Sequence, residues 1–525
     1  MEEVNHNELL LPSFILHLYK KRILMDIQQF VTTMQSGYAL KSGGIPIGAA
    51  KLDGKVYSEC PVLLPLKTMN RHGLIAGATG TGKTKTLQMI AEGLSDAGVP
   101  VMLMDIKGDL SGLAASGFAN DKIKERYLLL GMTYQPQNYP VELLSISDEK
   151  GARLRATVSE FGPVLLAKVL ELNDAQEGLL AILFKFCDDN ALPVLDLKDF
   201  TKVLQYAANE GKALIEKDYG RISTVSLGTI LRKVVALQQQ GADQFFGELS
   251  FDIHDLMRID EKGRGLVNIL RVTDMQSSPK LFSTFMLQML AELYSVLPEE
   301  GDLEQPKLVL FIDEAHLIFR EAGKALLQQI ETIVKLIRSK GVGIFFCTQN
   351  PVDIPESVLS QLGLKIQHAL RAFTANDRKA IRQAAQNYPE SDFYKTEDLI
   401  TQLGIGEALV TVLNEKGIPT PLAYTFLTSP RSRMDILSES EIEDLVSRAV
   451  LIKKYNKVID RESAYEILNG KINGSNNFTQ NTDVKVKRPE KSSSWFEQAL
   501  NSAAGKQAQR SIVRTAFQIL QKMLK

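Results

Sequence analysis

Cysteine is scarce in this chain of 525 residues, which carries it only at Cys60, Cys187 and Cys347. Because the three lie far apart and none forms a C-x-x-C pair, the sequence provides neither a disulfide framework nor a zinc site. The six histidines are scattered, and none stands at metal-ligand spacing. So little cysteine is typical of a reducing compartment, and we expect a cytoplasmic protein.

A strong net charge is also absent, because 61 Lys and Arg residues are offset by 62 Asp and Glu residues. Any contact with nucleic acid must therefore be local rather than spread over the surface. No apolar run approaches the length of a transmembrane helix, and the apolar patch at 9–16 has the wrong flanking charges for a signal peptide. We expect a soluble protein in which residues 1–24 are a dispensable extension.

Strand-like and helix-like segments alternate along the chain, which predicts an α/β fold with a mainly parallel sheet. The segments 101–104 and 308–312 are continuous apolar runs, as expected for strands buried on both faces. The predicted strands span residues 74–77, 99–106, 141–146, 266–272, 308–313, 343–348 and 365–370, and segments 408–413 and 422–427 are candidates to extend the sheet.

Between residues 152 and 248 the apolar period becomes helical, which predicts a helical subdomain inserted after the third strand. Asn173 and Gln176 stand at capping-box spacing ahead of one of its helices. Three apolar stripes carry the pattern: Leu165, Val169 and Leu172; Leu179, Leu183 and Phe186; and Leu227, Leu231 and Val234.

The C-terminal part of the chain turns polar at residues 469–494, which predicts a flexible linker. It leads to residues 495–525, where Val513, Phe517 and Leu520 share one helical face. Basic residues decorate the rest of this segment, so we predict a basic amphipathic helix.

The stretch from Gly77 to Thr84, Gly-Ala-Thr-Gly-Thr-Gly-Lys-Thr, lies between a short apolar segment and a segment with helical spacing. Strand, glycine-rich turn and helix are the context of a P-loop, whose backbone N–H groups and helix N-terminus bind phosphates. Lys83 would reach the β- and γ-phosphates, and the Thr84 hydroxyl would coordinate Mg²⁺. We therefore predict a site for ATP and Mg²⁺ made by Gly77, Ala78, Thr79, Gly80, Thr81, Gly82, Lys83, Thr84 and Lys85.

A second acidic motif follows the apolar run at 308–312. Asp313 would stand at the carboxyl end of a buried strand, where α/β sheets bind ligands, and would hold the Mg²⁺ shell directly or through water. Glu314 would be the base that polarises water for attack on the γ-phosphate. This second acid favours hydrolysis over phosphoryl transfer to a small hydroxyl. We expect the nearby His316 to be structural.

Two further strand ends are candidates for the same site. Gln349 ends a strand that could lie between the P-loop strand and the Asp313 strand, where a polar residue would sense the γ-phosphate. The turn from Asp105 to Asp109 closes the strand after the P-loop helix. There Lys107 or Asp109 could contact phosphate, water or a neighbouring subunit, or the segment could be a simple turn.

Two arginines are candidates for the charge that stabilises phosphoryl transfer, which an arginine often supplies from a neighbouring subunit. Arg338 ends the helix after the Glu314 strand, and Arg371 follows the strand after Gln349. We predict that Arg338 acts in the neighbour's site and that Arg371 acts nearer its own; ordinary surface roles are the alternative for both.

These motifs together resemble the HerA/FtsK group of ring ATPases, and the segments 70–84 and 364–377 resemble most closely its bacterial YjgR-like branch. The resemblance covers about residues 25–467 and the basic terminal segment. It implies a RecA-like P-loop core, a homo-hexamer, and ATP hydrolysis coupled to moving a polymer, usually double-stranded DNA. The chain departs from the group in having no evident winged-helix module and no room for the N-terminal barrel of archaeal HerA.

Together with the resemblance, the predicted strands and helices divide the chain into six structural units. They are an N-terminal extension (1–45), a first part of the ATPase core (46–150), the inserted helical subdomain (151–260), a second part of the core (261–468), the linker (469–494) and the basic amphipathic helix (495–525). The last helix could bind DNA, a nuclease partner, an anionic membrane surface or a ring neighbour, or pack on the protein's own core.

Three functions remain open from the sequence. A DNA translocase or helicase predicts ATPase activity that DNA stimulates. An ATPase that moves or remodels protein predicts no such stimulation. A nucleotide-gated scaffold without turnover is disfavoured by Glu314.

Overall fold

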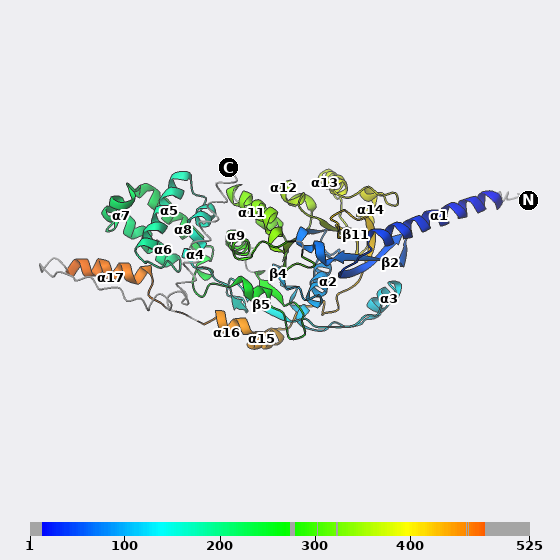
Figure 1. Ribbon diagram of the computed structural model, residues 1–525, viewed down its shortest axis with the longest axis horizontal. Coiled ribbons are helices and arrows are strands. Elements are labelled where there is room, and N and C mark those ends of the chain that lie inside the picture. Colours follow the sequence, from blue (N-terminus) through cyan, green and yellow to red (C-terminus); the bar gives the residue numbers. More distant parts are fainter. Residues whose placement is uncertain are drawn as a thin grey trace, which may run out of the picture.

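A large sheet forms the middle of the molecule, a lobe of helices lies at one end, and helix α1 projects from the other end (Figure 1). The computed structural model describes residues 13–273, 279–301, 303–321, 324–457, 459 and 461–477. Its strands are β1 (Gly44–Leu52), β2 (Lys55–Pro65), β3 (Gly73–Ala76), β4 (Val101–Asp105), β5 (Val141–Ser145), β6 (Ala152–Arg153), β7 (Val267–Arg271), β8 (Leu308–Ile312), β9 (Val342–Thr348), β10 (Leu364–Gln367), β11 (Glu407–Thr411) and β12 (Ala423–Leu427).

The helices surround this sheet and build the lobe. They are α1 (Ser13–Gly37), α2 (Lys83–Asp96), α3 (Asp121–Leu129), α4 (Val158–Val169), α5 (Asp174–Asp189), α6 (Leu197–Ala208), α7 (Lys212–Tyr219), α8 (Thr224–Gln238), α9 (Pro279–Val296), α10 (His316–Glu321), α11 (Lys324–Ile337), α12 (Glu356–Leu359), α13 (Ala375–Gln386), α14 (Thr396–Gln402), α15 (Glu439–Arg448), α16 (Val450–Tyr455) and α17 (Ala464–Asn477).

The sheet has the strand order β2-β1-β12-β11-β10-β3-β9-β8-β4-β7-β5-β6. Every neighbouring pair from β10 to β6 is parallel, and every pair from β2 to β10 is antiparallel. The predicted α/β fold with a mainly parallel sheet is confirmed, and the two late strands extend it as β11 and β12. Because the eight parallel strands end at one edge, the loops that follow them meet there.

Both faces of the sheet are covered, as the apolar runs predict. In β9 the side chains of Ile344 and Phe346 enter one apolar layer, and those of Phe345 and Cys347 enter the other. Helices α9 and α11 cover the first face, while α1 and α2 cover the second. Alternating burial on two faces fixes the register of β9 between its neighbours.

The β1–β2 hairpin corrects the predicted N-terminal boundary. Residues 1–45 were expected to be an extension, but β1 begins at Gly44 and α1 packs on the hairpin with Phe30 and Met34 fully buried. Asp53 and Gly54 make the turn, and both have positive φ. An Asp-Gly pair between two apolar segments is the strongest short-range hairpin signal, so this turn could be predicted from the sequence. Residues 1–12 lie outside the described part of the chain.

The lobe consists of helices α4 to α8 and enters the chain between β6 and β7 (Figure 1). Its three predicted apolar stripes face a common core in which Leu183, Phe186 and Val234 are buried. The predicted capping box starts α5: the Asn173 side chain accepts from the backbone N–H of Gln176 at 3.0 Å, and the Gln176 side chain accepts from that of Asn173 at 3.2 Å.

The chain after β12 ties the lobe to the sheet. Backbone N–H groups of Arg431 and Ser432 donate to the buried carboxylate of Glu92 in α2. Farther on, the hydroxyl of Ser463 and the backbone N–H of Tyr465 donate to Asp199 in α6. Helix α17 then packs on α6, so residues 469–477 are helical and not part of the predicted linker. The rest of that linker and the predicted helix 495–525 lie outside the described residues.

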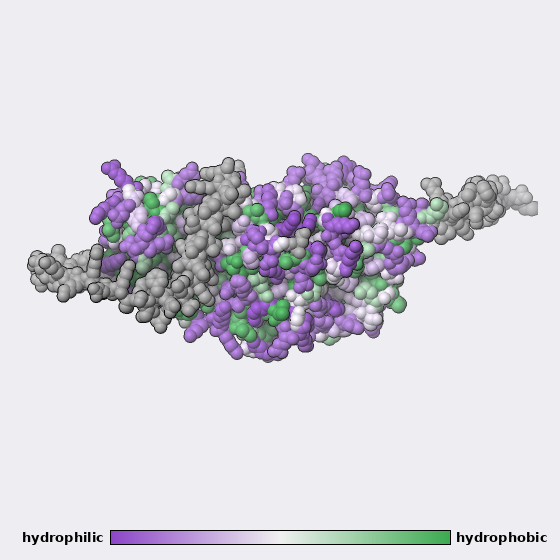
Figure 2. All heavy atoms as spheres, in the orientation of Figure 1, coloured by the Kyte–Doolittle hydropathy of each residue, from purple (hydrophilic) through white to green (hydrophobic). Residues whose placement is uncertain are grey.

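The exposed surface is mostly hydrophilic on the face drawn in Figure 2, where apolar side chains form only small areas. Within the described ranges, no helix is long and apolar enough to cross a membrane.

Candidate nucleotide site

The P-loop runs from the end of β3 into α2, as predicted. Gly82 takes φ of 110° to begin the helix, a conformation that strains any residue with a Cβ. Gly77 has φ of 153°, and a Cβ there would stand 2.5 Å from the Cβ of His368. The backbone N–H of Ala78 donates to the carbonyl of Ala369 at 2.8 Å. The segment after β10 therefore holds the loop from one side.

Lys83 begins α2 and is buried beneath the loop. Its ammonium donates to the carbonyls of Gly77 at 2.7 Å and Ala78 at 3.2 Å, so it lies under the backbone that would receive phosphates. Burial and the nearby charge of Lys107 lower the pKa of Lys83. Thr84 is half-buried in the same helical turn.

The remaining loop residues divide into a tip and a base. Thr79 and Gly80 are exposed at the tip, while the buried hydroxyl of Thr81 donates to the carbonyl of Ala78 at 2.7 Å. The ammonium of Lys85 donates to the carbonyl of Met434 at 2.5 Å, so this side chain is engaged by the C-terminal segment.

Asp313 follows β8 and is only 3% exposed. One of its oxygens, Oδ2, is buried without a hydrogen-bond partner among the described residues. Burial raises the pKa of Asp313 to about 6, although the charge of Lys107 opposes this. A buried carboxylate oxygen without a hydrogen bond fits a divalent cation, because oxygen ligands are those that Mg²⁺ prefers.

No cluster of three His, Cys, Asp or Glu side chains suited to a metal occurs in the described ranges. A Mg²⁺ ion here would therefore depend on few protein ligands. The Asp313 carboxylate and the Thr84 hydroxyl fit the usual arrangement in which phosphate oxygens and water complete the shell.

Glu314 lies next to Asp313 with φ of 46°, a left-handed conformation that is uncommon outside glycine. Its Oε1 forms an ion pair with Lys107, and its Oε2 lies 3.2 Å from Nδ1 of His316. Burial acts to raise the pKa of Glu314, but the hydrogen bond and charge of Lys107 outweigh it and the pKa is lowered. The carboxylate is thus held ionised, as a base requires.

Gln349 directly follows β9, and β9 lies between β3 and β8 as the sequence predicts. Its amide Nε2 lies 3.5 Å from both carboxylate oxygens of Glu314. The sheet therefore brings Lys83, Asp313 and Glu314 together with Gln349 at the carboxyl edge of three adjacent strands.

His368 is a site residue that the sequence analysis missed. It follows β10, is fully buried, and its Nε2 lies 2.9 Å from the hydroxyl of Thr86 in α2. Burial lowers the pKa of His368 to about 4, so the ring is neutral at pH 7. The sequence offers a weak signal, the polar pair Gln367 and His368 at a strand end. The strand order, which places β10 beside β3, is needed to assign His368 to the site.

The two candidate arginines lie at opposite edges of the sheet. Arg371 is exposed, four residues after β10, at the edge that carries the P-loop. Arg338 is exposed in the turn before β9. Because β9 has seven residues, about 3.3 Å each, the edge at Arg338 is roughly 20 Å from the P-loop edge.

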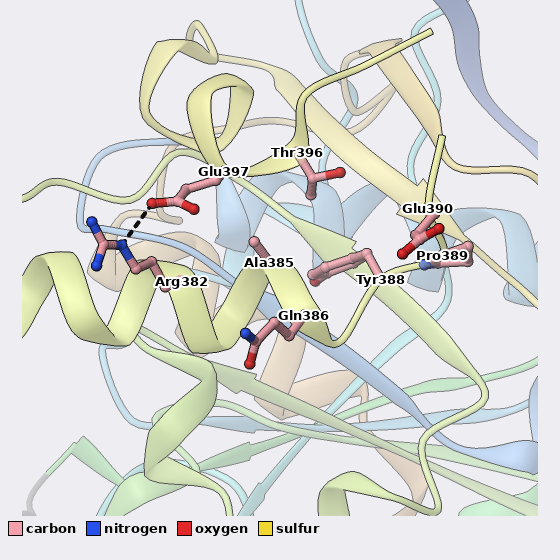
Figure 3. A pocket seen from close by; sticks show the side chains of 8 residues that line it. All are labelled: Arg382, Ala385, Gln386, Tyr388, Pro389, Glu390, Thr396 and Glu397. Atoms are coloured by element: carbon pink, nitrogen blue, oxygen red, sulfur yellow. Dashed lines mark hydrogen bonds and ion pairs between the residues drawn. The ribbon is translucent and has the colours of Figure 1, made fainter. Parts of the chain in front are cut away.

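Arg338 lines a cavity of about 450 Å³ together with Arg71, Lys335 and Lys365. None of the described residues that line it is acidic, and none of the four cations forms an ion pair within the described part of the chain. An adjacent hollow of about 360 Å³ between α13 and α14 differs, because its Arg382 is paired with Glu397 at 2.9 Å (Figure 3). The first cavity therefore has an excess of positive charge.

Comparisons with known proteins identify the family of this chain. The family model described as Helicase HerA-like C-terminal matches residues 51–524. The DNA double-strand break repair helicase HerA of Sulfolobus acidocaldarius is 22% identical over 377 residues, which are 71% of this chain and 68% of that protein. The DNA import protein CedB of the same organism is 24% identical over 68% of this chain and 52% of its own length.

Among solved structures, the bacterial conjugative coupling protein TrwB aligns with 77% of this chain and 93% of its own, at 14% identity and a TM-score of 0.49. The chain spans about two thirds of the length of the HerA relative and about half of CedB. The family match covers most of the sequence, including the P-loop and both acidic residues. This chain therefore belongs to the Helicase HerA-like C-terminal family and is a P-loop ATPase.

Proposed function

We propose that this chain hydrolyses ATP and uses the energy to move DNA. The observation that carries the proposal is the convergence of Lys83, Asp313 and Glu314 at one sheet edge, where Gln349 reaches the Glu314 carboxylate. A nucleotide-gated scaffold would not need an ionised, oriented carboxylate beside the P-loop.

Each residue has a proposed part in the reaction. Lys83 and the loop N–H groups bind the phosphates, while Thr84 and Asp313 hold Mg²⁺, which neutralises phosphate charge when bound. Glu314 takes a proton from water, the water oxygen bonds to the γ-phosphorus, and the bond from that phosphorus to the bridging oxygen of ADP breaks. Gln349 orients Glu314 and responds when the γ-phosphate is lost.

Two variants of the full chain separate binding from hydrolysis. Lys83→Ala should lose ATP affinity, whereas Glu314→Gln should bind ATP and lose about 10²–10⁴-fold in turnover, because a positioned base contributes that much. Near wild-type kcat in Glu314→Gln would remove Glu314 from the mechanism.

The proposal of DNA as the polymer is supported by the relatives, which are named a DNA repair helicase and a DNA import protein. The alternative is an ATPase that remodels protein without DNA. Stimulation of turnover by DNA distinguishes the two. The scarcity of cysteine supports a cytoplasmic location.

We also propose a homo-hexameric ring in which Arg338 acts on the nucleotide of a neighbour. Its position at the sheet edge opposite its own P-loop supports this role, since an arginine roughly 20 Å away cannot reach its own γ-phosphate. The surrounding cations Arg71, Lys335 and Lys365 suit a phosphate-bearing partner. Arg371, at the P-loop edge, is proposed to act nearer its own site.

Subunit mixing tests the ring. Arg338→Ala and Lys83→Ala subunits should each be inactive alone, and their mixture should recover part of the activity, because some interfaces then combine two intact halves. A fully active monomer would overturn the proposal.

A further inference from the structure

The turn from Asp105 to Asp109 is built to fix the place of Lys107. The buried carboxylate of Asp105 accepts three backbone hydrogen bonds, from Gly108 at 2.7 Å and from Asp109 and Leu110 at 3.1 Å. Gly108 has φ of 75°, which lets the chain reverse there. The turn follows β4, the neighbour of β8, and so lies beside Asp313 and Glu314.

Lys107 supplies the cation for two adjacent buried carboxylates. Its ammonium pairs with Oε1 of Glu314 and lies 3.9 Å from Oδ2 of Asp313. The two acidic side chains are 5% and 7% exposed, while that of Lys107 is 35% exposed. Buried like charges repel strongly unless a cation lies between or beside them. Lys83 forms no ion pair with either carboxylate in this structure, because its ammonium donates to the carbonyls of Gly77 and Ala78.

The carboxylate of Glu314 is held from three directions. Lys107 contacts Oε1, His316 lies 3.2 Å from Oε2, and Gln349 lies 3.5 Å from both oxygens. Of these three partners, Lys107 provides a full positive charge in direct contact with the Glu314 carboxylate, whereas the Gln349 amide is uncharged. A base works only when its oxygen points at the water that it deprotonates.

We propose that Lys107 is a positioning residue that holds the Glu314 carboxylate in its working orientation. Lys107 acts through Glu314 and is not a phosphate ligand. This inference rests on the proposed hydrolysis by Glu314, and it assigns the turn after β4 to the same reaction.

A double-mutant cycle on the full chain tests this role. Lys107→Met, which keeps the stem of the side chain and removes its charge, should lower kcat about 10–100-fold, the range found when a partner that orients a metal ligand is removed. Its affinity for ATP should stay within about twofold of wild type. In the Glu314→Gln background, Lys107→Met should cost nothing further, because the residue that it positions is already disabled.

Two variants serve as controls. Lys107→Arg, which retains a cation, should recover at least part of the lost kcat. Lys122→Met, which removes an exposed lysine on α3, should leave kcat unchanged. An unchanged thermal unfolding midpoint in Lys107→Met would show that its lower kcat does not come from unfolding.

Three results would overturn the positioning role: wild-type kcat in Lys107→Met, a loss of ATP affinity like that of Lys83→Ala, or effects of Lys107→Met and Glu314→Gln that multiply. The first would leave the proposed function standing if Glu314→Gln is inactive. If Glu314→Gln hydrolyses ATP at the wild-type rate, the proposed function itself fails.

Discussion

Acidification should destabilise the sheet through His72, the residue that precedes the P-loop strand. The ring is 2% exposed, and its Nε2 donates to the carbonyl of Val334 in α11 at 2.8 Å. Its Nδ1 accepts from the backbone N–H of Ile344 in β9 at 3.0 Å. Only a neutral ring with its proton on Nε2 makes both bonds, so protonation removes the second and charges a buried group.

The size of the effect follows from the pKa. Burial lowers the pKa of His72 from 6.5 to about 4, so between these values the unfolded chain binds a proton that the folded chain does not. The stability from the neutral ring is complete above about 6.5 and is lost as the pH falls through 4. A shift of this size corresponds to about 3 kcal/mol.

Urea unfolding of wild type and His72→Asn at several pH values between 7 and 4 isolates the contribution of His72 protonation to the free energy of unfolding. Asn does not titrate and can still accept from Ile344. The difference in unfolding free energy, wild type minus variant, should therefore shrink by about 3 kcal/mol as the pH falls. His368 has a similarly low pKa but is present in both proteins and cancels. A difference that does not change with pH would refute the reasoning.

Two further predictions concern the phosphate loop and the C-terminal segment. Gly77→Ala should weaken ATP binding about tenfold or more, because its Cβ would stand 2.5 Å from the Cβ of His368 and overpacking costs about 1–3 kcal/mol. The control is Gly54→Ala, a glycine with φ of 79° but no neighbour within 4 Å, which should leave ATP affinity unchanged in the same binding titration. Deleting residues 478–525, whose segment 483–525 has nine Lys and Arg against three Asp and Glu (a net of +6), should weaken DNA binding and flatten its salt dependence while basal ATPase activity persists. An unchanged salt slope with intact affinity would assign this segment to packing or assembly.

Most of the sheet could be predicted because its strands are buried on both faces and therefore read as apolar runs. The run before Asp313 and the one that ends at Thr348 are of this kind. The hairpin β1–β2 was missed because Pro46 and Pro61 interrupt the strand pattern, and because buried and exposed residues do not alternate regularly along β2. Its Asp-Gly turn was the one clear signal.

Part of the candidate site could likewise be predicted from the sequence, and part could not. Lys83, Asp313 and Glu314 belong to contiguous motifs, so their chemistry could be predicted from the sequence. Gln349 and Lys107 were candidates for the same site, but the contact of Lys107 with Glu314 was not predicted. Lys107 lies more than 200 residues earlier in the chain, and only the pairing of β4 with β8 brings the two together. His368 likewise depends on the pairing of β10 with β3. Single-sequence patterns do not encode long-range strand order, which explains why neither the Lys107–Glu314 contact nor the place of His368 was predicted.

Steady-state ATP turnover with and without double-stranded DNA tests most directly whether this P-loop ATPase moves DNA. The wild-type chain should hydrolyse ATP faster when DNA is added, and Glu314→Gln should show neither basal nor stimulated turnover. Equal wild-type turnover with and without DNA, alongside an inactive Glu314→Gln, would contradict DNA translocation and favour an ATPase that remodels protein.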